Sequence, residues 1–166
     1  MAAAEARSGD HAVAADAPVF SFAEVEIDAS IEIVWNVLTA IDRWPTWNPD
    51  VKSVSIDGPP TEGTIFRWKA GPGTITSTVV RIDRPRRIAW DGRTLGIRAK
   101  HGWHLEPRDR RTHVRTEESY DGLVARLLRR PLQRILDRTL ADGVHSLKAE
   151  AERSGHSARD PTGRAR

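Results

Sequence analysis

The spacing of apolar residues changes early in the chain from a strand-like to a helix-like period. Residues 19–28 are rich in Phe and Val and alternate between apolar and polar positions, a pattern typical of a β-strand. Apolar residues then recur every three or four positions over 31–39, which predicts a short amphipathic helix with Ser30 as its N-cap. Residues 42–50 hold two prolines and two tryptophans, and this interruption predicts a helical turn and a loop.

The middle of the chain consists of short apolar-rich runs separated by residues that favour turns. The runs that we predict to be strands are 51–56, 64–69, 74–83, 87–91, 95–106 and 112–120. Segments rich in Gly, Pro and Asp stand between them and favour a turn over continued pairing. Because parallel neighbours need crossovers of about a dozen residues or more, strands joined so closely must be antiparallel. The pattern therefore predicts an antiparallel meander.

A helical period returns near the C-terminus and forms one long apolar stripe. Its members are Leu132, Ile135, Leu136, Thr139, Leu140, Gly143, Val144, Leu147 and Ala151. Charged residues fill the other side, as expected of a helix packed on one face. Pro131 suits the first turn of this helix, and residues 123–130 predict a separate short helix before it. A helix over 131–153 is about 34 Å long at about 1.5 Å per residue, so it can cross a whole sheet.

Five segments carry a resemblance to a known family. They are IDASIEIVWNVLTAID (27–42), WPTWNP (44–49), PRRIAW (85–90), WHLEP (103–107) and GVHSLKAEAE (143–152). In their order and spacing the chain resembles the START-like (SRPBCC) superfamily, specifically its polyketide cyclase/dehydrase-like branch. The resemblance implies an α+β helix-grip fold, in which a curved, seven-stranded antiparallel sheet surrounds a long C-terminal helix and two short helices follow the first strand. It also implies a cavity that holds lipids, polyketides or other hydrophobic molecules in relatives, and it implies no common reaction.

Composition supports one domain with a tail at each end. Residues 1–17 are Ala-rich and lack periodicity, and residues 154–166 contain few apolar side chains, so both are predicted to be disordered. Residues 18–153 are predicted to form one START-like ligand-binding domain, because no linker divides them. The chain has no cysteine, which excludes disulfides, thiolate catalysis and cysteine-ligated zinc.

Charge and motif content exclude several other classes of function. The formal net charge is only +3, without a concentrated basic face, so nucleic acid is not an expected partner. No apolar run is long enough to span a membrane, so we expect a cytoplasmic protein without integral membrane association. The sequence contains no phosphate-binding loop, no HExxH motif and no histidines at metal-ligand spacing. We therefore expect neither a cofactor nor a metal.

Strand alternation places two titratable residues on the face that meets the long helix. In 95–106 the more apolar side includes His101, and pairing Leu105 with Thr112 across the next turn puts Glu118 on the same side. A buried imidazole within reach of a carboxylate can act as an acid/base pair. A hydrogen bond to backbone or water is the more ordinary role of such residues. His101 and Glu118 are thus the candidate catalytic residues.

The same alternation predicts the walls of the cavity. The residues predicted to line it are Phe66, Trp68, Thr78, Val80, Ile97, Trp103, Thr116, Leu136, Leu140 and Val144. Among the six tryptophans, Trp68 and Trp103 are the candidates for ligand contact, because their strand positions point inward. The other tryptophans are predicted to pack in the core or over it.

An arginine cluster precedes the long helix. Arg126, Arg129 and Arg130 fall where the mouth of the cavity is expected. A solvated helix surface is the ordinary explanation, and recognition of an anionic ligand or lipid headgroup is the alternative. The alternative allows weak contact with a membrane surface.

Two functions are consistent with this pattern. The first is binding of a small hydrophobic ligand, lipid-like or polyketide-like, in the internal cavity. The second is a cofactor-independent cyclase or dehydratase that acts on a polyketide-like substrate, with His101 and Glu118 moving protons. We favour binding, because the sequence contains no stronger catalytic constellation.

Overall fold

The computed structural model describes residues 13–159. Its elements are β1 (Val19–Ile27), α1 (Ile31–Thr39), the 3-10 turn η1 (Ile41–Arg43), α2 (Trp44–Trp47), β2 (Val51–Ile56), β3 (Ile65–Ala70), β4 (Gly73–Asp83), β5 (Arg87–Thr94), β6 (Ile97–Arg108), β7 (Arg111–Asp121), α3 (Leu123–Leu127) and α4 (Arg129–Arg159). The strands follow the alternating segments, and α1 and α4 follow the segments with a period of three to four residues.

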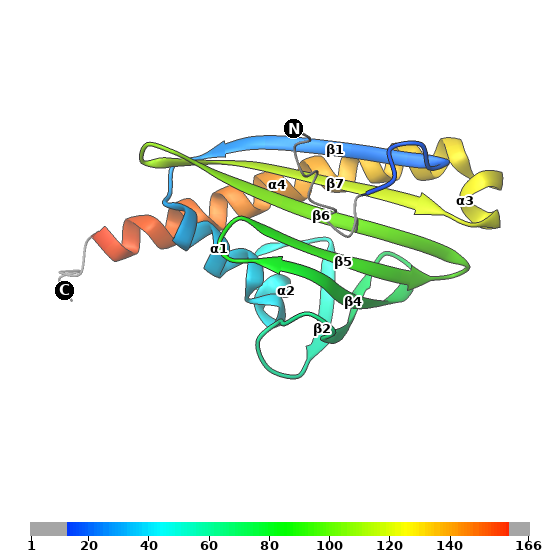
Figure 1. Cartoon of the computed structure of the whole chain (residues 1–166), viewed down its shortest axis with the longest axis horizontal. Helices are drawn as coiled ribbons and strands as arrows, with labels where there is room; N and C mark the ends of the chain where they lie inside the picture. The colour runs from blue at the N-terminus through cyan, green and yellow to red at the C-terminus, as the bar shows by residue number, and fades with distance from the viewer. Residues whose placement is uncertain (1–12, 160–166) are drawn as a thin grey trace, which may run out of the picture.

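The strands form one antiparallel sheet in the order β1-β7-β6-β5-β4-β3-β2. The first strand pairs with the last, whereas α1, η1 and α2 carry the chain to the opposite edge, where β2 begins. Figure 1 shows a curved sheet with α4 running along one face beside β1 and β7, and with α1 and α2 nearer to β2. The predicted α+β helix-grip fold is confirmed, including the seven-stranded sheet and the short helices after β1.

Polar contacts fix α4 along the edge strand β1. The Ser21 hydroxyl donates to Asp137 Oδ1 at 2.6 Å, and Lys148 Nζ donates to the backbone oxygen of Glu26 at 2.6 Å. Because these contacts lie at two points along both elements, they fix where each α4 residue lies along the length of β1.

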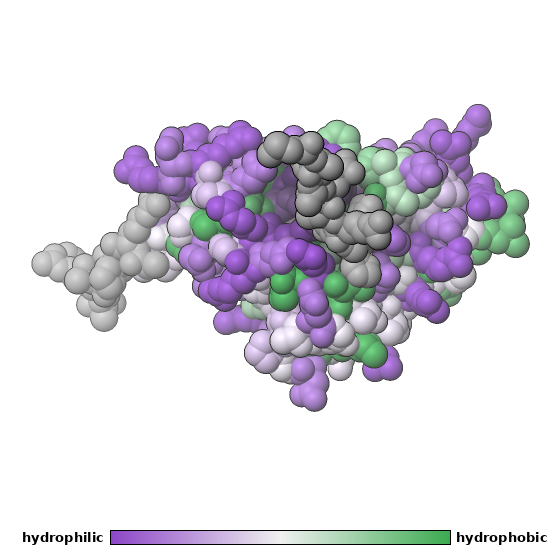
Figure 2. All heavy atoms as spheres, viewed as in Figure 1, coloured by the Kyte–Doolittle hydropathy of each residue, from purple (hydrophilic) through white to green (hydrophobic). Residues whose placement is uncertain are grey.

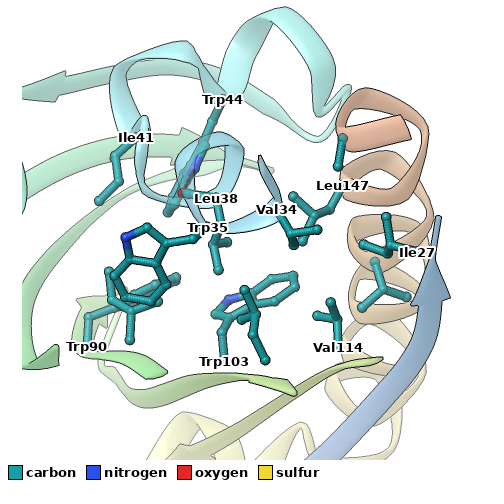
Figure 3. Packing of buried hydrophobic residues seen from close by; sticks show 14 of the residues in the cluster. Ile27, Val34, Trp35, Leu38, Ile41, Trp44, Trp90, Trp103, Val114 and Leu147 are labelled. Atoms are coloured by element: carbon teal, nitrogen blue, oxygen red, sulfur yellow. Dashed lines mark hydrogen bonds between the residues drawn. The ribbon is translucent and has the colours of Figure 1, made fainter. Parts of the chain in front are cut away.

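The main apolar core lies between the sheet and α1, α2 and the C-terminal half of α4. The Trp44 ring lies 5.8 Å from Phe66, 5.7 Å from Trp68 and 5.5 Å from Trp90, measured between ring centroids. Its Nε1 donates to the backbone oxygen of Leu38 at 2.9 Å. Figure 3 shows these helices and strands directing their large side chains toward one another. This aromatic packing, edge-to-face for Phe66 and Trp68 and tilted for Trp90, fills the end of the fold nearest α1 and α2.

A second, smaller apolar cluster lies toward the N-terminal end of α4. It consists of Val19, Leu136 and Leu140, with Tyr120 and Leu132 packed against it. It touches the main core through Ala23, which packs against both clusters.

The N-terminal boundary differs from the predicted one. Residues 13–17 were predicted to belong to a disordered tail, but they lie on the outer face of the sheet, where the backbone N–H of Ala14 donates to Ser119 Oγ at 3.3 Å. Residues 1–12 of that tail lie outside the described part of the chain.

The C-terminal helix is longer than the pattern predicted. It begins at Arg129 rather than 131 and continues past residue 153 to Arg159. Gly155 is buried, and a Cβ there would lie 3.6 Å from Ile33 Cδ1, so this turn packs on α1 despite its polar sequence. Residues 160–166 lie outside the described residues. Within 13–159, no helix is both long and apolar enough to cross a membrane.

Candidate functional site

Strands β6 and β7 place His101 and Glu118 directly opposite each other. Opposed residues of an antiparallel pair share one face, and here that face is the concave one that α4 covers. Trp103 and Thr116 form the next opposed pair, and Tyr120 lies two residues beyond Glu118 on the same face. We refer to His101, Thr116, Glu118 and Tyr120 as the inner polar site.

The hydrogen bonds of Thr116 fix the tautomer of the His101 imidazole. Thr116 Oγ1 donates to the backbone oxygen of Gly102 at 3.2 Å, which uses the single hydroxyl proton. Thr116 Oγ1 also lies 2.8 Å from His101 Nε2, and with the hydroxyl donating to Gly102 the tautomer that pairs with it carries the ring proton on Nε2. The other ring nitrogen, Nδ1, therefore presents a lone pair, and Glu118 Oε2 lies 3.4 Å from it.

Two tryptophans enclose the His101 ring. The Trp90 ring centroid lies 4.7 Å from it, and the Trp103 ring lies 5.6 Å away at an interplanar angle of 20°. The His101 and Glu118 side chains are only 9% and 12% exposed. The pair is therefore held in a largely apolar cage, where isolated charges are unfavourable.

Burial shifts both pKa values toward the neutral forms. It lowers the pKa of His101 to about 3 and raises the pKa of Glu118 to about 8. At neutral pH the imidazole is thus uncharged and the carboxyl group carries a proton, because desolvation disfavours the charged form of each. The site contains an acid and a lone pair side by side, both without charge.

Tyr120 extends this site toward the smaller apolar cluster. Burial raises the pKa of its phenol, and the nearby Glu118 carboxylate raises it further. The phenol therefore remains protonated at neutral pH and can donate a hydrogen bond.

A buried glycine in α4 faces open space. Gly143 is buried, yet a Cβ built on it would meet no other atom within 4 Å. Protein interiors are usually packed densely enough to prevent this. Open space therefore lies next to α4 at this residue.

The polar contacts between α4 and β1 show where along the strands this open space lies. Gly143 lies about midway between Asp137, which contacts Ser21, and Lys148, which contacts Glu26. It is therefore level with the middle of β1, where Ala23 pairs with Thr116. Along the strands, this open space is therefore level with Thr116, which belongs to the inner polar site.

Two buried nitrogen atoms at this height have no hydrogen-bond partner within the described chain. They are Nε1 of Trp103 and Nδ1 of His101, which lies 3.4 Å from Glu118 Oε2 in a geometry that makes no hydrogen bond. Buried polar atoms are nearly always paired in native proteins, so unpaired ones call for an explanation. One is an acceptor and the other a donor, which would suit a ligand with a hydroxyl or carbonyl group.

We expect Gly143→Ala to raise the free energy of unfolding by about 0.5–1 kcal/mol, because alanine favours helix over glycine and its methyl group finds free space. Chemical denaturation followed by circular dichroism measures the change. A clear loss of stability would show that the space beside Gly143 is filled.

The outer face of the sheet has a hollow of its own. It has a volume of about 390 Å³ and lies between residues 14–18 and the ends of β5 and β6. Arg93, Lys100 and Asp91 are among the charged residues that line it. Since the sheet separates it from the inner polar site, it is not an extension of that site. Within residues 13–159, no three His, Asp or Glu side chains gather so as to hold a metal ion.

A comparison with protein families matches nearly the whole described chain. The matching family is described as "Polyketide cyclase / dehydrase and lipid transport", and the match covers residues 22–152. The chain belongs to this family. The match begins inside β1 and ends inside α4, so it includes the whole inner polar site, and the resemblance recognised in the sequence is confirmed.

Several solved structures have the same fold as this member of the polyketide cyclase/dehydrase family. The Zhui aromatase/cyclase from Streptomyces sp. R1128 has a TM-score of 0.74 at 19% identity, with 87% of this chain and 98% of that chain covered. A hypothetical protein from Helicobacter pylori has a TM-score of 0.74 at 18% identity, covering 82% and 90%. A START superfamily protein from Mycobacterium smegmatis has a TM-score of 0.71 at 15% identity, covering 81% and 98%. Identities this low establish a common fold without a common substrate. No curated protein matches the sequence.

Several of the residues predicted to line the cavity of this family member are buried. They are Phe66, Trp103, Thr116, Leu136, Leu140 and Val144. Phe66 and Trp68 belong to the aromatic core around Trp44, and Trp68 Nε1 donates to Ser77 Oγ at 3.1 Å. Ile97 is half-buried at the start of β6. Contact of these side chains with a ligand stays a prediction.

The predicted inward orientation of Thr78 is wrong. Thr78 pairs with Ile65, whose side chain is 55% exposed, whereas the neighbouring Ser77 is fully buried. Val80 lies where the register between β4 and β5 shifts, between Val79 and Arg81. This bulge changes the alternation within β4, so one face assignment cannot hold for the whole strand.

The predicted register of β6 and β7 was also wrong, by two residues. Leu105 pairs with Val114 rather than Thr112, since the strands continue to Arg108 and Arg111 around a tight turn. Asp109 has φ of 55° in this turn, a conformation that Asp accepts more readily than most residues. A shift of two positions preserves the face of each residue, so His101 and Glu118 still face inward and become direct neighbours.

Sequence reasoning overlooked Tyr120 and Gly143. Tyr120 has the same alternation as Glu118 and could have been identified from it. Gly143 belongs to the predicted apolar stripe, but the pattern does not show that open space lies beside it. A glycine in the middle of a helix lowers its stability by about 1 kcal/mol relative to alanine. A glycine on the predicted buried face is therefore the signal that could have identified this position.

Proposed function

We propose that this chain binds a small, largely apolar molecule in the gap between Gly143 and the inner polar site. The observation that carries the proposal is the open space facing a buried glycine, at the height where Trp103 Nε1 and His101 Nδ1 lack partners. The apolar neighbours of this space suit a hydrocarbon body, and the unpaired nitrogen atoms suit a single oxygen-bearing group.

Several polar groups would orient such a ligand. The Trp103 N–H, the protonated Glu118 carboxyl and the Tyr120 phenol can each donate to a ligand oxygen, and His101 Nδ1 can accept from a hydroxyl. Since all four are neutral at pH 7, a ligand carbonyl or hydroxyl would be accommodated more readily than a carboxylate or an amine. Lipid-like and polyketide-like molecules with isolated oxygens fit this description.

Native mass spectrometry of the protein purified from its own host tests the proposal. We expect an additional mass that is released by organic solvent and that belongs to an apolar molecule containing oxygen. Protein that carries no such mass, and that takes up no apolar molecule from a host lipid extract, would contradict the proposal.

His101→Ala is expected to weaken binding of the retained ligand about tenfold, the effect of losing one hydrogen bond of about 1.4 kcal/mol. The fold should persist, because β6 keeps its backbone pairing. Isothermal titration with the ligand identified above measures the change. Unaltered affinity would remove His101 from the binding site.

A second candidate function is cyclisation or dehydration of a polyketide-like substrate, and the observation that favours it is the Glu118 pKa of about 8. A general acid works best when its pKa lies near the working pH. His101, with a pKa of about 3, is a weak base and would take up a proton only after Glu118 has given up its own.

The proton balance of a dehydration can be met inside this site. Glu118 would protonate the leaving hydroxyl, which departs as water, and His101 Nδ1 would accept the proton from the neighbouring carbon. Transfer of that proton from Nδ1 to Oε2, 3.4 Å away, would restore both residues. Incubating the protein with a β-hydroxy ketone and following water loss by mass spectrometry separates this function from binding alone.

A further inference from the structure

The end of the molecule around α3 exposes a group of leucine side chains. Leu123 is 72% exposed, Leu127 is 74% exposed and Leu128 is 50% exposed. Leu123 and Leu127 are four residues apart and therefore lie on one side of α3. Scattered single apolar residues are ordinary on protein surfaces, whereas a group of this kind indicates an interaction site.

The β5–β6 turn adds a further leucine to this group. A Cβ at Gly122, the N-cap of α3, would lie 2.7 Å from the backbone oxygen of Gly96, so the turn and α3 are in close contact. Leu95, next to Gly96 in this turn, is 67% exposed. We call Leu95, Leu123, Leu127 and Leu128 the leucine tip.

Leu95 is unfavourable where it stands on two counts. Its φ is 45°, in the left-handed region that glycine and asparagine accept far more readily than leucine. Its apolar side chain is also largely exposed, although its Cδ1 lies beside Gly73 at the start of β4, 3.2 Å from where a Cβ would be. A residue that local stability disfavours in both respects is better explained by a contact made outside the folded chain.

Arginines accompany the leucine tip. The segment 122–135 contains Arg126, Arg129, Arg130 and Arg134 and no acidic residue, and these arginines are exposed. Arg126 approaches Asp121 only to 3.8 Å. Figure 2 shows hydrophobic atoms at the end of the molecule where α3 lies, with hydrophilic atoms beside them. The tip therefore combines protruding apolar side chains with a local positive charge.

From this combination we infer that the leucine tip docks on an anionic lipid surface. Protruding leucines can enter the boundary between headgroups and acyl chains, while flanking arginines reach lipid phosphates. A protein partner would instead need a hollow that receives each leucine, and the small area of the tip favours a soft, non-specific medium. This inference does not depend on which molecule the inner polar site binds.

Flotation with vesicles of phosphatidylglycerol and phosphatidylcholine, compared with phosphatidylcholine alone, tests the inference. We expect the full chain to float with the anionic vesicles and not with the neutral ones. The double variant Leu123→Ser/Leu127→Ser should bind at least about tenfold more weakly, since each buried leucine contributes about 1 kcal/mol or more. Leu95→Asn should also bind more weakly while its thermal stability stays equal or rises, because Asn suits the turn.

A further arginine variant and two matched controls, at the other end of the sheet and on β3, show whether lipid binding belongs to the leucine tip. Arg126, Arg129 and Arg130 replaced together by Gln should weaken binding about a hundredfold at about 1 kcal/mol per arginine. The same replacement of Arg108, Arg110 and Arg111, in the β6–β7 turn at the opposite end of the sheet in Figure 1, should have little effect. Ile65→Ser, at a site 55% exposed on β3, controls for the loss of an exposed apolar side chain.

Three outcomes would overturn the inference. The first is absence of binding to anionic vesicles. The second is equal loss of binding in the two arginine variants, which would indicate general charge attraction. The third is a dimer in light scattering that the Leu123→Ser/Leu127→Ser variant dissociates, which would assign the leucine tip to a second copy of this chain.

Discussion

Gly143→Leu is expected to abolish ligand uptake while leaving the protein folded. The added side chain would occupy the gap between α4 and the inner polar site, and an occupied gap excludes any ligand that needs it. We expect the affinity to fall by at least about a hundredfold, equivalent to about 2.7 kcal/mol. The ligand identified by native mass spectrometry, added back to delipidated protein, provides the measurement.

Gly155 supplies the matched control on the same helix. A Cβ there would already be in contact with Ile33 Cδ1 at 3.6 Å and Ala29 Cβ at 3.7 Å, so a larger side chain would press on α1 and on the chain segment before it. Gly155→Leu should therefore lower the free energy of unfolding by about 1–3 kcal/mol, the usual effect of overpacking, whereas Gly143→Leu should not. Equal destabilisation by the two variants would mean that α4 is packed equally closely at both positions.

Glu118→Gln is expected to remove a pH dependence of stability that the wild-type protein has above pH 6.5. The pKa of Glu118 is about 8 in the folded protein against an ordinary value of 4.5. Between these values the folded state holds a proton that the unfolded state has released, so stability falls as pH rises. From pH 6.5 to 8 the loss amounts to about 2 kcal/mol, at about 1.4 kcal/mol per pH unit.

His101 acts in the opposite direction at lower pH. Its pKa is about 3 in the folded protein against an ordinary value of 6.5, so the unfolded state binds a proton that the folded state lacks, and stability falls as pH falls through this window. Between pH 4.5 and 6.5 the effects of Glu118 and His101 on the pH dependence of stability cancel, and above pH 6.5 only that of Glu118 remains. The difference between wild type and Glu118→Gln above pH 6.5 therefore isolates the carboxyl group.

Urea unfolding of wild type and Glu118→Gln at pH 6.5 and at pH 8 measures this difference. If the protein catalyses a dehydration, the same variant should also lose about 10²–10⁴ in rate, the usual contribution of a general acid. Parallel stability curves for the two proteins would show that Glu118 is ionised at neutral pH, and the site would then prefer a cationic partner group.

The sequence predicted the architecture well because each element has a clear apolar period and because turn residues separate the strands. It also predicted the orientation of His101 and Glu118, since side-chain direction in a strand depends on parity and survives a register error of two. The pairing itself depended on the geometry around Asp109, and the orientation of Thr78 depended on the bulge near Val80. Neither can be read from alternation alone.

The most informative part of the site was hidden for a different reason. Whether open space lies beside Gly143 depends on how α4 sits on the sheet. The contacts that position α4, such as the one between Ser21 and Asp137, join residues far apart in the chain. Pattern analysis identifies the residues of the inward stripe and cannot tell which of them lacks a neighbour. Likewise, residues 13–17 show no strand or helix pattern in the sequence, so their contact with the sheet through the Ala14 N–H and Ser119 Oγ could not be predicted.

A crystal structure of the protein purified from its host would show whether the space beside Gly143 holds a ligand. We expect electron density for an apolar molecule, or for ordered solvent in its place, within contact distance of Gly143 Cα, Trp103 Nε1 and the Glu118 carboxyl group. Side chains of the sheet packed directly against Gly143, with Trp103 Nε1 and His101 Nδ1 paired to protein atoms, would contradict this expectation.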